Sequence, residues 1–349
     1  MRVLLLFTGL TLISAAGFAQ WRSISGFPRS RETRTIRSCP DIFKMHKEGK
    51  TLDLRYTSNF SLNKKDTSVR TLLIFIHGLH RNAMGYFDDA VEGVRSAGQK
   101  KTTLVIAPQY ATEEDMNEFR LGGDFLYWNK AQWKDGYASV ITSFRNHQVS
   151  MSSYEVMDSL IASVLGSGNF PNIRRVVVAG HSAGGQFVDR YSVTTPIPEV
   201  WTSVSFRFII MNPSSYLYPD GRRPASDGSY VVPDSAVCPE YNHYPKGLIQ
   251  LNAYAEAAGA DHILANMLHR DIFILLGGED TDIDDPDLDT SCAGNMQGPF
   301  RLARGISFIG FISTYPGYQG KKNFAIVRNV GHSGTLIESD EAIRWIFGQ

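Results

Sequence analysis

Short apolar runs of strand length alternate with segments of helical periodicity along most of this sequence. The runs are continuous rather than alternating, as expected for strands covered on both faces, and they lie at 71–78, 102–110, 174–182, 207–215, 271–280 and 323–332. Apolar residues at helical spacing occur in the segments 84–98, 152–165, 184–193, 253–270, 299–312 and 340–347. Strands that alternate with helices predict an α/β fold with a mostly parallel central sheet flanked by helices.

The N-terminal residues predict an export signal. The stretch MRVLLLFTGLTLISAAGFAQ places Arg2 before a short apolar run that ends in small residues, which indicates a signal peptide at 1–19 cleaved near Ala19. The alternative is an uncleaved anchor, but the run is short for a membrane span and Arg22 follows it closely. We therefore expect a secreted or periplasmic protein with no stable membrane insertion after cleavage.

The remainder of the chain divides into an arm and one domain. Residues 20–50 begin with an Arg- and Ser-rich stretch without regular periodicity, and we expect an N-terminal arm or linker there; contact with an anionic surface is the alternative. The strand–helix rhythm runs unbroken over 51–349, which predicts a single α/β domain. Lys plus Arg and Asp plus Glu both number 35, so nothing in the charge favours a nucleic-acid partner. The sequence carries no signal for an oligomeric state.

The chain has three cysteines, and export would permit a disulfide. Cys238 and Cys292 both lie in loop-like sequence of the α/β domain, and we expect them to pair with each other. An odd count leaves one cysteine over, which on this prediction is Cys39.

Two long insertions follow strand ends, at 111–149 and 212–247. Open α/β sheets bind ligands outside the carboxyl ends of their strands, and both insertions are rich in aromatic residues. We expect Trp128, Trp133 and Tyr216 to line a substrate pocket together with His181. The alternative is that these aromatic side chains only pack the loops onto the core.

The tripeptide Gly-His-Ser occurs twice, and the first copy has the pattern Gly-x-Ser-x-Gly at residues 180–184. The strand-like RRVVVA precedes it and a helix-forming segment follows, which is the strand–elbow–helix context that this motif requires. Glycine at 180 and 184 lets the turn close tightly and present Ser182 above the sheet. We predict that Ser182 is a nucleophile.

The second copy supplies a base for this serine. His332 follows the last predicted strand, whereas Ser333 cannot form a second elbow because position 335 is Thr rather than Gly. A carboxylate must then orient the imidazole, and Asp280 follows the strand DIFILLGG in the chain order Ser, Asp, His. Asp282 is the second choice, and Asp284 and Glu279 are weaker ones.

Backbone amides complete the predicted site. The N–H of Ala183, directly after the nucleophile, is one expected oxyanion donor. The second is expected in the loop HGLHRNA, from Leu79 with His80 as the alternative, while Asn82 is expected to cap the following helix. Asp280, Asp282 and Asp284 resemble the start of a calcium loop, but the later glycine and glutamate are missing, so we expect no metal site.

Together, His77-Gly78, the elbow GHSAG, Asp280 and the late Gly-His at 331–332 resemble the α/β-hydrolase superfamily over 51–349. The segment HGLHRNA is similar to the HGxxRNA pattern of secreted bacterial and fungal serine hydrolases, some of them esterases. The resemblance implies an α/β-hydrolase fold with loop insertions over the carboxyl edge of the sheet. It also implies Ser182 as nucleophile, His332 as base, Asp280 as acid, Leu79 and Ala183 as oxyanion donors, and no cofactor.

The sequence therefore predicts a secreted serine hydrolase that cleaves carboxylic esters, small or polymeric, through an acyl-enzyme. An amidase or peptidase with the same triad is one alternative, because residue types alone do not separate ester from amide cleavage. A lipase or polyester depolymerase is another. A non-catalytic binding module is the least expected, since all three members of the triad are present. The acyl and alcohol groups of the substrate are left open.

Overall fold

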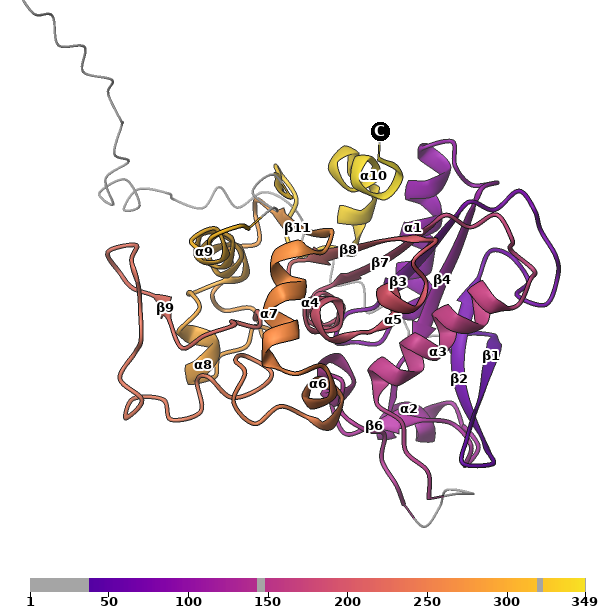
Figure 1. The fold of residues 1–349 in the computed structure, drawn as a ribbon, viewed down its shortest axis with the longest axis horizontal. Helices are drawn as coiled ribbons and strands as arrows, with labels where there is room; N and C mark the ends of the chain where they lie inside the picture. The colour runs from indigo at the N-terminus through magenta and orange to yellow at the C-terminus, as the bar shows by residue number, and fades with distance from the viewer. Residues whose placement is uncertain (1–37, 143–147, 319–322, 349) are drawn as a thin grey trace, which may run out of the picture. The chain divides into compact units, whose positions relative to one another are not determined.

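The computed structural model describes residues 38–142, 148–318 and 323–348. Within these residues, eight strands form the central sheet, in the order β1-β2-β4-β3-β7-β8-β11-β12 (Figure 1). Their bounds are β1 Asp41–Lys47, β2 Lys50–Ser58, β3 Thr71–Ile76, β4 Thr103–Gln109, β7 Arg175–His181, β8 Ser205–Met211, β11 Ile272–Gly277 and β12 Phe324–Val327. The strands from β4 to β12 pair in parallel, whereas β1 and β2 are antiparallel additions at one edge. The predicted mostly parallel sheet is confirmed.

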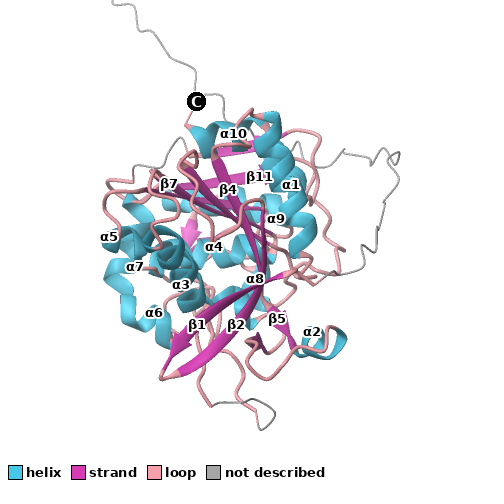
Figure 2. Cartoon of the chain, turned by 90° about the vertical axis from the view of Figure 1, so that its right-hand side faces the viewer, coloured by secondary structure: helices cyan, strands magenta, loops and turns pink. Residues whose placement is uncertain are grey.

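The β1–β2 hairpin corrects one predicted boundary (Figure 2). Residues 41–50 were expected in the arm, but β1 pairs with β2 over its whole length. Glu48 and Gly49 both have positive φ (51° and 71°), as a two-residue hairpin turn requires. The sheet therefore begins at Asp41. The predicted signal peptide at 1–19 and the arm up to residue 37 lie outside the described residues.

Helices cover both faces of the sheet. Alternate residues of β3 enter two separate core clusters, Leu72, Ile74 and Ile76 on one face and Leu73 and Phe75 on the other. Side chains of α1 Ala83–Ser96 and α10 Asp340–Phe347 belong to the second cluster. The first cluster includes side chains of α3 Ser153–Gly166, α4 Ala183–Thr194, α7 Ala260–His269 and α9 Arg301–Ile312 (Figure 1). Double coverage explains the continuous apolar runs.

In their described residues, the two insertions contain only short elements. The first holds β5 Ala111–Thr112, α2 Glu113–Glu118, β6 Tyr127–Trp128 and a 3₁₀ turn at Gln132–Asp135, and the second holds β9 Arg223–Pro224 and β10 Tyr230–Val231. Elsewhere lie α5 Ile197–Val200, α6 Ala253–Ala258, α8 Cys292–Asn295 and a 3₁₀ turn at Gly334–Glu338. None of the helices in the described part of the chain combines the length and apolar character needed to span a bilayer.

The carboxyl ends of the parallel strands bring five chain segments to one edge of the sheet. His77 follows β3, Ser182 follows β7, Asn212 follows β8, Asp280 follows β11 and His332 follows β12. Among the described residues, the last strand, β12, is four residues long and pairs only with β11, so it is an outermost strand of the sheet. Ser182, Asp280 and His332, the side chains predicted to be catalytic, therefore all follow the carboxyl ends of strands, where such sheets bind ligands.

Candidate active site

Ser182 occupies a sharp turn between β7 and α4. Its φ and ψ are 58° and −118°, a combination rarely adopted by residues other than glycine, and its N–H donates to Met211 O at 2.9 Å. A Cβ at Gly180 would lie 2.1 Å from Gly184 O, and one at Gly184 would lie 2.2 Å from Ile76 O. The two glycines are therefore required by close backbone contacts, as the elbow motif predicts.

The start of α4 lies directly beside this serine. Ala183 is the first residue of the helix and is 3% exposed. The first N–H groups of a helix have no partner within it, and the helix dipole adds a partial positive charge at the same end. The backbone around Ser182 is thus suited to receive a developing negative charge.

His332 and Asp280 form a hydrogen bond. His332 Nδ1 lies 2.7 Å from Asp280 Oδ2, and the side chains are 21% and 2% exposed. An ionised carboxylate can only accept, so the proton is on Nδ1 and Nε2 is left with an acceptor lone pair. This arrangement gives the imidazole the tautomer that a general base needs.

Parallel pairing of β11 with β12 brings these two residues together. The contact continues past the strand ends, where Gly278 N–H donates to Val327 O at 2.8 Å and Glu279 N–H to Val330 O at 2.9 Å. Asp280 and His332 are therefore held by neighbouring loops that are bonded to each other.

Asn212 is a residue of the site that sequence reasoning missed. It is fully buried with φ 43°, its Oδ1 accepts from Gly277 N–H at 2.8 Å, and its Nδ2 donates to Gly331 O at 3.2 Å. One side chain thus links the end of β8 to the loops that carry Asp280 and His332. Its place immediately after a predicted strand was the available signal.

His181 lies against His332 rather than on a pocket wall. The ring centroids are 4.5 Å apart, His181 is 2% exposed, and its Nδ1 is 2.9 Å from Tyr86 Oη. Burial, with smaller contributions from His332 and Arg301, lowers the pKa of His181 well below its usual value. The neutral ring of His181, the residue that precedes the nucleophile, therefore packs against the imidazole of His332.

The loop after β3 passes close to Ser182. A Cβ at Gly78 would lie 3.5 Å from Ser182 Cβ and 2.6 Å from Tyr86 Oη, so a larger residue would require Tyr86 to shift. Leu79 and His80 follow directly, and His80 Nε2 lies 2.8 Å from Asp287 Oδ2. Asn82 caps α1 by accepting from Gly85 N–H at 3.2 Å, as predicted.

His77 links this loop to the residue that follows β4. It is fully buried, its Nε2 accepts from Tyr110 N–H at 3.0 Å, and its Nδ1 lies 2.9 Å from Gly78 O. Because Nε2 accepts, Nδ1 carries the proton and donates to Gly78 O. Burial lowers the pKa of His77 to about 4, so the ring is neutral near pH 7 and serves as a structural bridge.

The aromatic residues predicted to line a pocket are in the core. Trp128, Trp133 and Tyr216 are each 0% exposed. Trp133 stacks on Tyr110 at a centroid distance of 5.6 Å, and Tyr216 stacks on Phe308 at 4.6 Å. This placement corrects the pocket interpretation and favours the alternative, in which the side chains anchor the insertions to the core.

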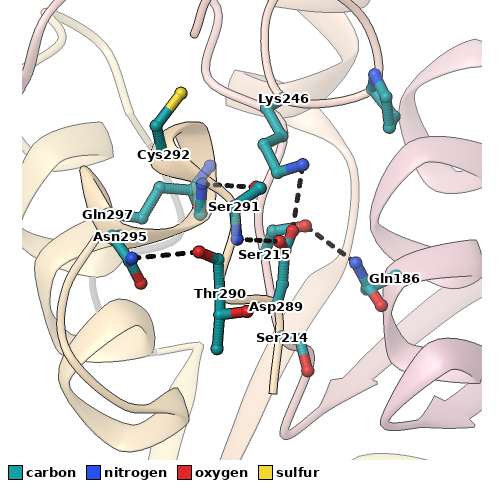
Figure 3. Close-up of polar contacts among 12 residues, drawn as sticks. Gln186, Ser214, Ser215, Lys246, Asp289, Thr290, Ser291, Cys292, Asn295 and Gln297 are labelled. Carbon is teal, nitrogen blue, oxygen red and sulfur yellow. Dashed lines mark hydrogen bonds and ion pairs between the residues drawn. The ribbon is translucent and has the colours of Figure 1, made fainter. Parts of the chain in front are cut away.

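The second insertion is linked twice to the segment that follows Asp280. Cys238 and Cys292 form a disulfide, as predicted, with Cα atoms 6.0 Å apart. Figure 3 shows Lys246 Nζ pairing with Asp289, at 2.9 Å from Oδ2. The same figure shows Gln186 Nε2 donating to Ser215 Oγ at 2.7 Å. Cys39 is 1% exposed and lies in a different cluster, with Ala83 and Ala107.

The acidic loop, residues 279–289 after β11, has its own internal contacts. Asp282 Oδ1 accepts from Asp284 N–H at 3.0 Å, and Asp285 Oδ1 accepts from Asp287 N–H at 2.8 Å. Across the described ranges, no group of three or more His, Cys, Asp or Glu side chains is placed to hold a metal ion.

Comparison with known proteins was informative only at the level of structure. No protein-family model matches the chain, and no curated protein matches it in sequence. Among solved structures, poly(aspartic acid) hydrolase-1 from Sphingomonas sp. KT-1 is 21% identical, with a TM-score of 0.55 over 89% of this chain and 99% of that one. LpqC, a poly(3-hydroxybutyrate) depolymerase from Bordetella parapertussis, is 20% identical, with a TM-score of 0.58 over 88% and 90%. With the parallel sheet and its covering helices, these similarities identify the fold as the α/β-hydrolase fold.

Proposed function

We propose that this chain is a serine hydrolase that cleaves carboxylic esters through an acyl-enzyme intermediate. The observation that carries the proposal is the hydrogen bond from His332 to buried Asp280, at the same carboxyl edge of the sheet as a serine on a strand–elbow–helix turn. Ser182 Oγ attacks the ester carbonyl while His332 Nε2 takes its proton and returns it to the leaving alcohol. Water then repeats the cycle and releases the acid.

The tetrahedral oxygen would be bound by the N–H groups of Ala183 and Leu79. Ala183 begins α4, and the glycine before Leu79 lies against Ser182. Donors that are fixed before the reaction stabilise the developing charge without reorganising, which is commonly a large part of the rate enhancement.

Labelling with a fluorophosphonate probe tests whether the site is catalytic. We expect the probe to modify the wild-type protein and not Ser182→Ala. Ser333→Ala is a matched control, because it alters the second Gly-His-Ser copy and should leave labelling intact. Absence of labelling in the wild-type protein would favour the binding-module alternative, and labelling that survives in Ser182→Ala would assign the reactive nucleophile to another residue.

The class of bond is tested with matched ester and amide substrates that share an acyl group. The structural neighbours include a hydrolase of poly(aspartic acid) and a polyester depolymerase, so the amidase alternative stays in the comparison. We expect faster turnover of the ester, because resonance stabilises an amide carbonyl more strongly and the amide nitrogen must be protonated before the amine can leave. Faster turnover of the amide would replace the ester assignment with an amidase.

A polymeric ester is the second candidate substrate. Val231, Val232 and Val237 of the second insertion are 48%, 68% and 72% exposed, so this insertion presents apolar side chains to solvent. A polyester film and a short soluble ester with the same acyl group separate the two substrates. Polymer preference predicts a larger relative loss on the film when these valines are changed to serine.

We also propose that the protein is exported. The Cys238–Cys292 disulfide supports this, since such bonds persist in oxidising compartments. N-terminal sequencing of the mature protein should place its start near Gln20. A mature chain that retains residues 1–19 would overturn cleavage at that site.

A further inference from the structure

Arg301 is a fully buried charge that the proposed mechanism does not use. It is the first residue of α9 and is 0% exposed. Its Nη1 lies 3.0 Å from Asp285 Oδ2 and 3.6 Å from Asp280 Oδ1, and its Nε donates to Ser214 Oγ at 2.9 Å. One guanidinium thus faces two carboxylates of the acidic loop.

The two oxygens of Asp280 have different partners. Oδ2 accepts from His332, whereas Oδ1 faces Arg301. The N-terminus of α9 also holds the backbone of Asp280, because Leu302 N–H donates to the backbone carbonyl oxygen of Asp280 at 3.1 Å. A buried carboxylate is costly unless it is paired and hydrogen-bonded. Arg301, itself held by hydrogen bonds to Asp285 and Ser214, supplies the opposite charge near Oδ1 of Asp280.

We propose that Arg301 is a positioning residue for the base. It holds Asp280 with Oδ2 toward His332 Nδ1, and with Asp285 it sets how readily the imidazole binds a proton. This inference rests on the proposed role of His332 as general base. Arg301 contacts no reacting atom in that mechanism and acts through Asp280.

The charge around His332 can be counted from the elements packed at this edge. Asp280 and Asp285 are the facing acids, Arg301 is the facing cation, and His181 is neutral. Other titratable groups nearby are on α1, on the loop after β3 and on the acidic loop: Tyr86, Asp89, His80 and Asp287. Changing Arg301 or Asp285 therefore alters the local charge in opposite directions.

The local charge determines the direction in which each variant should shift the titration midpoint of His332. Arg301→Met removes a positive charge, so the imidazole should bind a proton more readily and its titration midpoint should rise by about one pH unit. Asp285→Asn removes a negative charge, and the midpoint should fall by a similar amount. Arg301→Lys keeps the charge but loses the fork, so its midpoint should stay near the wild-type value.

The experiment is an NMR titration of the His332 ring in the purified mature protein, with the resonance assigned by its loss in His332→Asn. Asp284→Asn, an exposed change in the same loop, is the control and should leave the midpoint in place. If Arg301→Met does not fold, Asp285→Asn and Arg301→Lys still test the signs. Midpoints that do not move in Asp285→Asn, or that move the same way in Asp285→Asn and Arg301→Met, would overturn the proposal.

The NMR titration of His332 does not depend on catalytic turnover. If the fluorophosphonate probe fails to label the wild-type protein while the midpoints shift as expected, the catalytic proposal fails and the electrostatic role of Arg301 stands. If labelling succeeds and the midpoints do not shift, only Arg301 loses its role. In an active enzyme, the acid limb of the pH–rate profile should stay in place in Arg301→Lys and move in Arg301→Met. This result would also support the positioning role of Arg301.

Discussion

His332 Nδ1 and Asp280 Oδ2 lie 2.7 Å apart, although 52 positions separate the two residues in the chain. The acceptor is almost completely buried while the donor is partly exposed. The carboxylate can therefore hold the imidazole through Nδ1, which leaves Nε2 for the proton transfer that the proposed mechanism requires.

Asp280→Asn should reduce kcat by roughly 10⁴-fold with little change in KM, because an amide can donate to Nδ1 and favour the wrong tautomer. Steady-state kinetics on an aryl ester measures the effect. Asp282 is exposed, so Asp282→Asn serves as the control and should retain most of the activity. The reverse order of effects would assign the acid to Asp282.

Gly180→Ala should prevent stable folding of the elbow. The added Cβ would meet the backbone carbonyl of Gly184, which no side-chain rotation can relieve. We expect a loss of more than ~4 kcal/mol in the free energy of unfolding, measured by urea denaturation. Gly122→Ala has open space around the new methyl group and should be nearly neutral; a comparable loss there would show that the elbow is not special.

His77 should make the protein less stable in acid. Burial lowers its pKa from 6.5 to about 4, so between these values the unfolded chain binds a proton that the folded chain does not. The contribution of neutral His77 to the free energy of unfolding is fully present above pH 6.5 and is lost as the pH falls toward 4. It amounts to ~3 kcal/mol.

The measurement is urea denaturation at pH 7 and pH 4.5. His77→Gln, whose amide oxygen can accept from Tyr110 N–H, should be less stable at pH 7 and should vary less with pH. The exposed His262→Gln should vary with pH as the wild type does. Equal pH dependence in wild type and His77→Gln would rule out His77 as a source.

The Cys238–Cys292 bond closes a loop with a sequence separation of 54. In the chain-entropy treatment, such a loop stabilises the folded state by about 4 kcal/mol. Cys238→Ser/Cys292→Ser should therefore unfold at lower urea than the oxidised wild type and should coincide with the reduced wild type. Identical unfolding of oxidised and reduced wild type would show that the bond contributes no stability.

The sequence was sufficient for the parts of this fold that repeat a local pattern. Continuous apolar runs located the parallel strands, and Gly180 and Gly184 identified the elbow because backbone contact there tolerates no side chain. The pairing of Asp280 with His332 could be expected because consecutive parallel strands deliver their carboxyl ends to one edge.

Other features depend on contacts that no local pattern shows. The strand β1 was missed because an antiparallel edge strand alternates buried and exposed residues and lacks a continuous apolar run. Trp128 and Trp133 looked like pocket residues, since an aromatic-rich insertion reads the same whether its rings face a ligand or the core. Asn212 and Arg301 act through partners far away in sequence, and only the folded chain brings them together.

The short strand β12 has a consequence for how this protein would lose activity. It carries the loop with His332, pairs on one side only, and leaves Phe324 and Ile326 41% and 39% exposed. Outer strands detach at a smaller free-energy cost than central ones, so warming should release the imidazole while the serine turn stays folded. In a heating series, ester turnover should therefore vanish at a lower temperature than the far-ultraviolet circular dichroism signal, and should return on cooling.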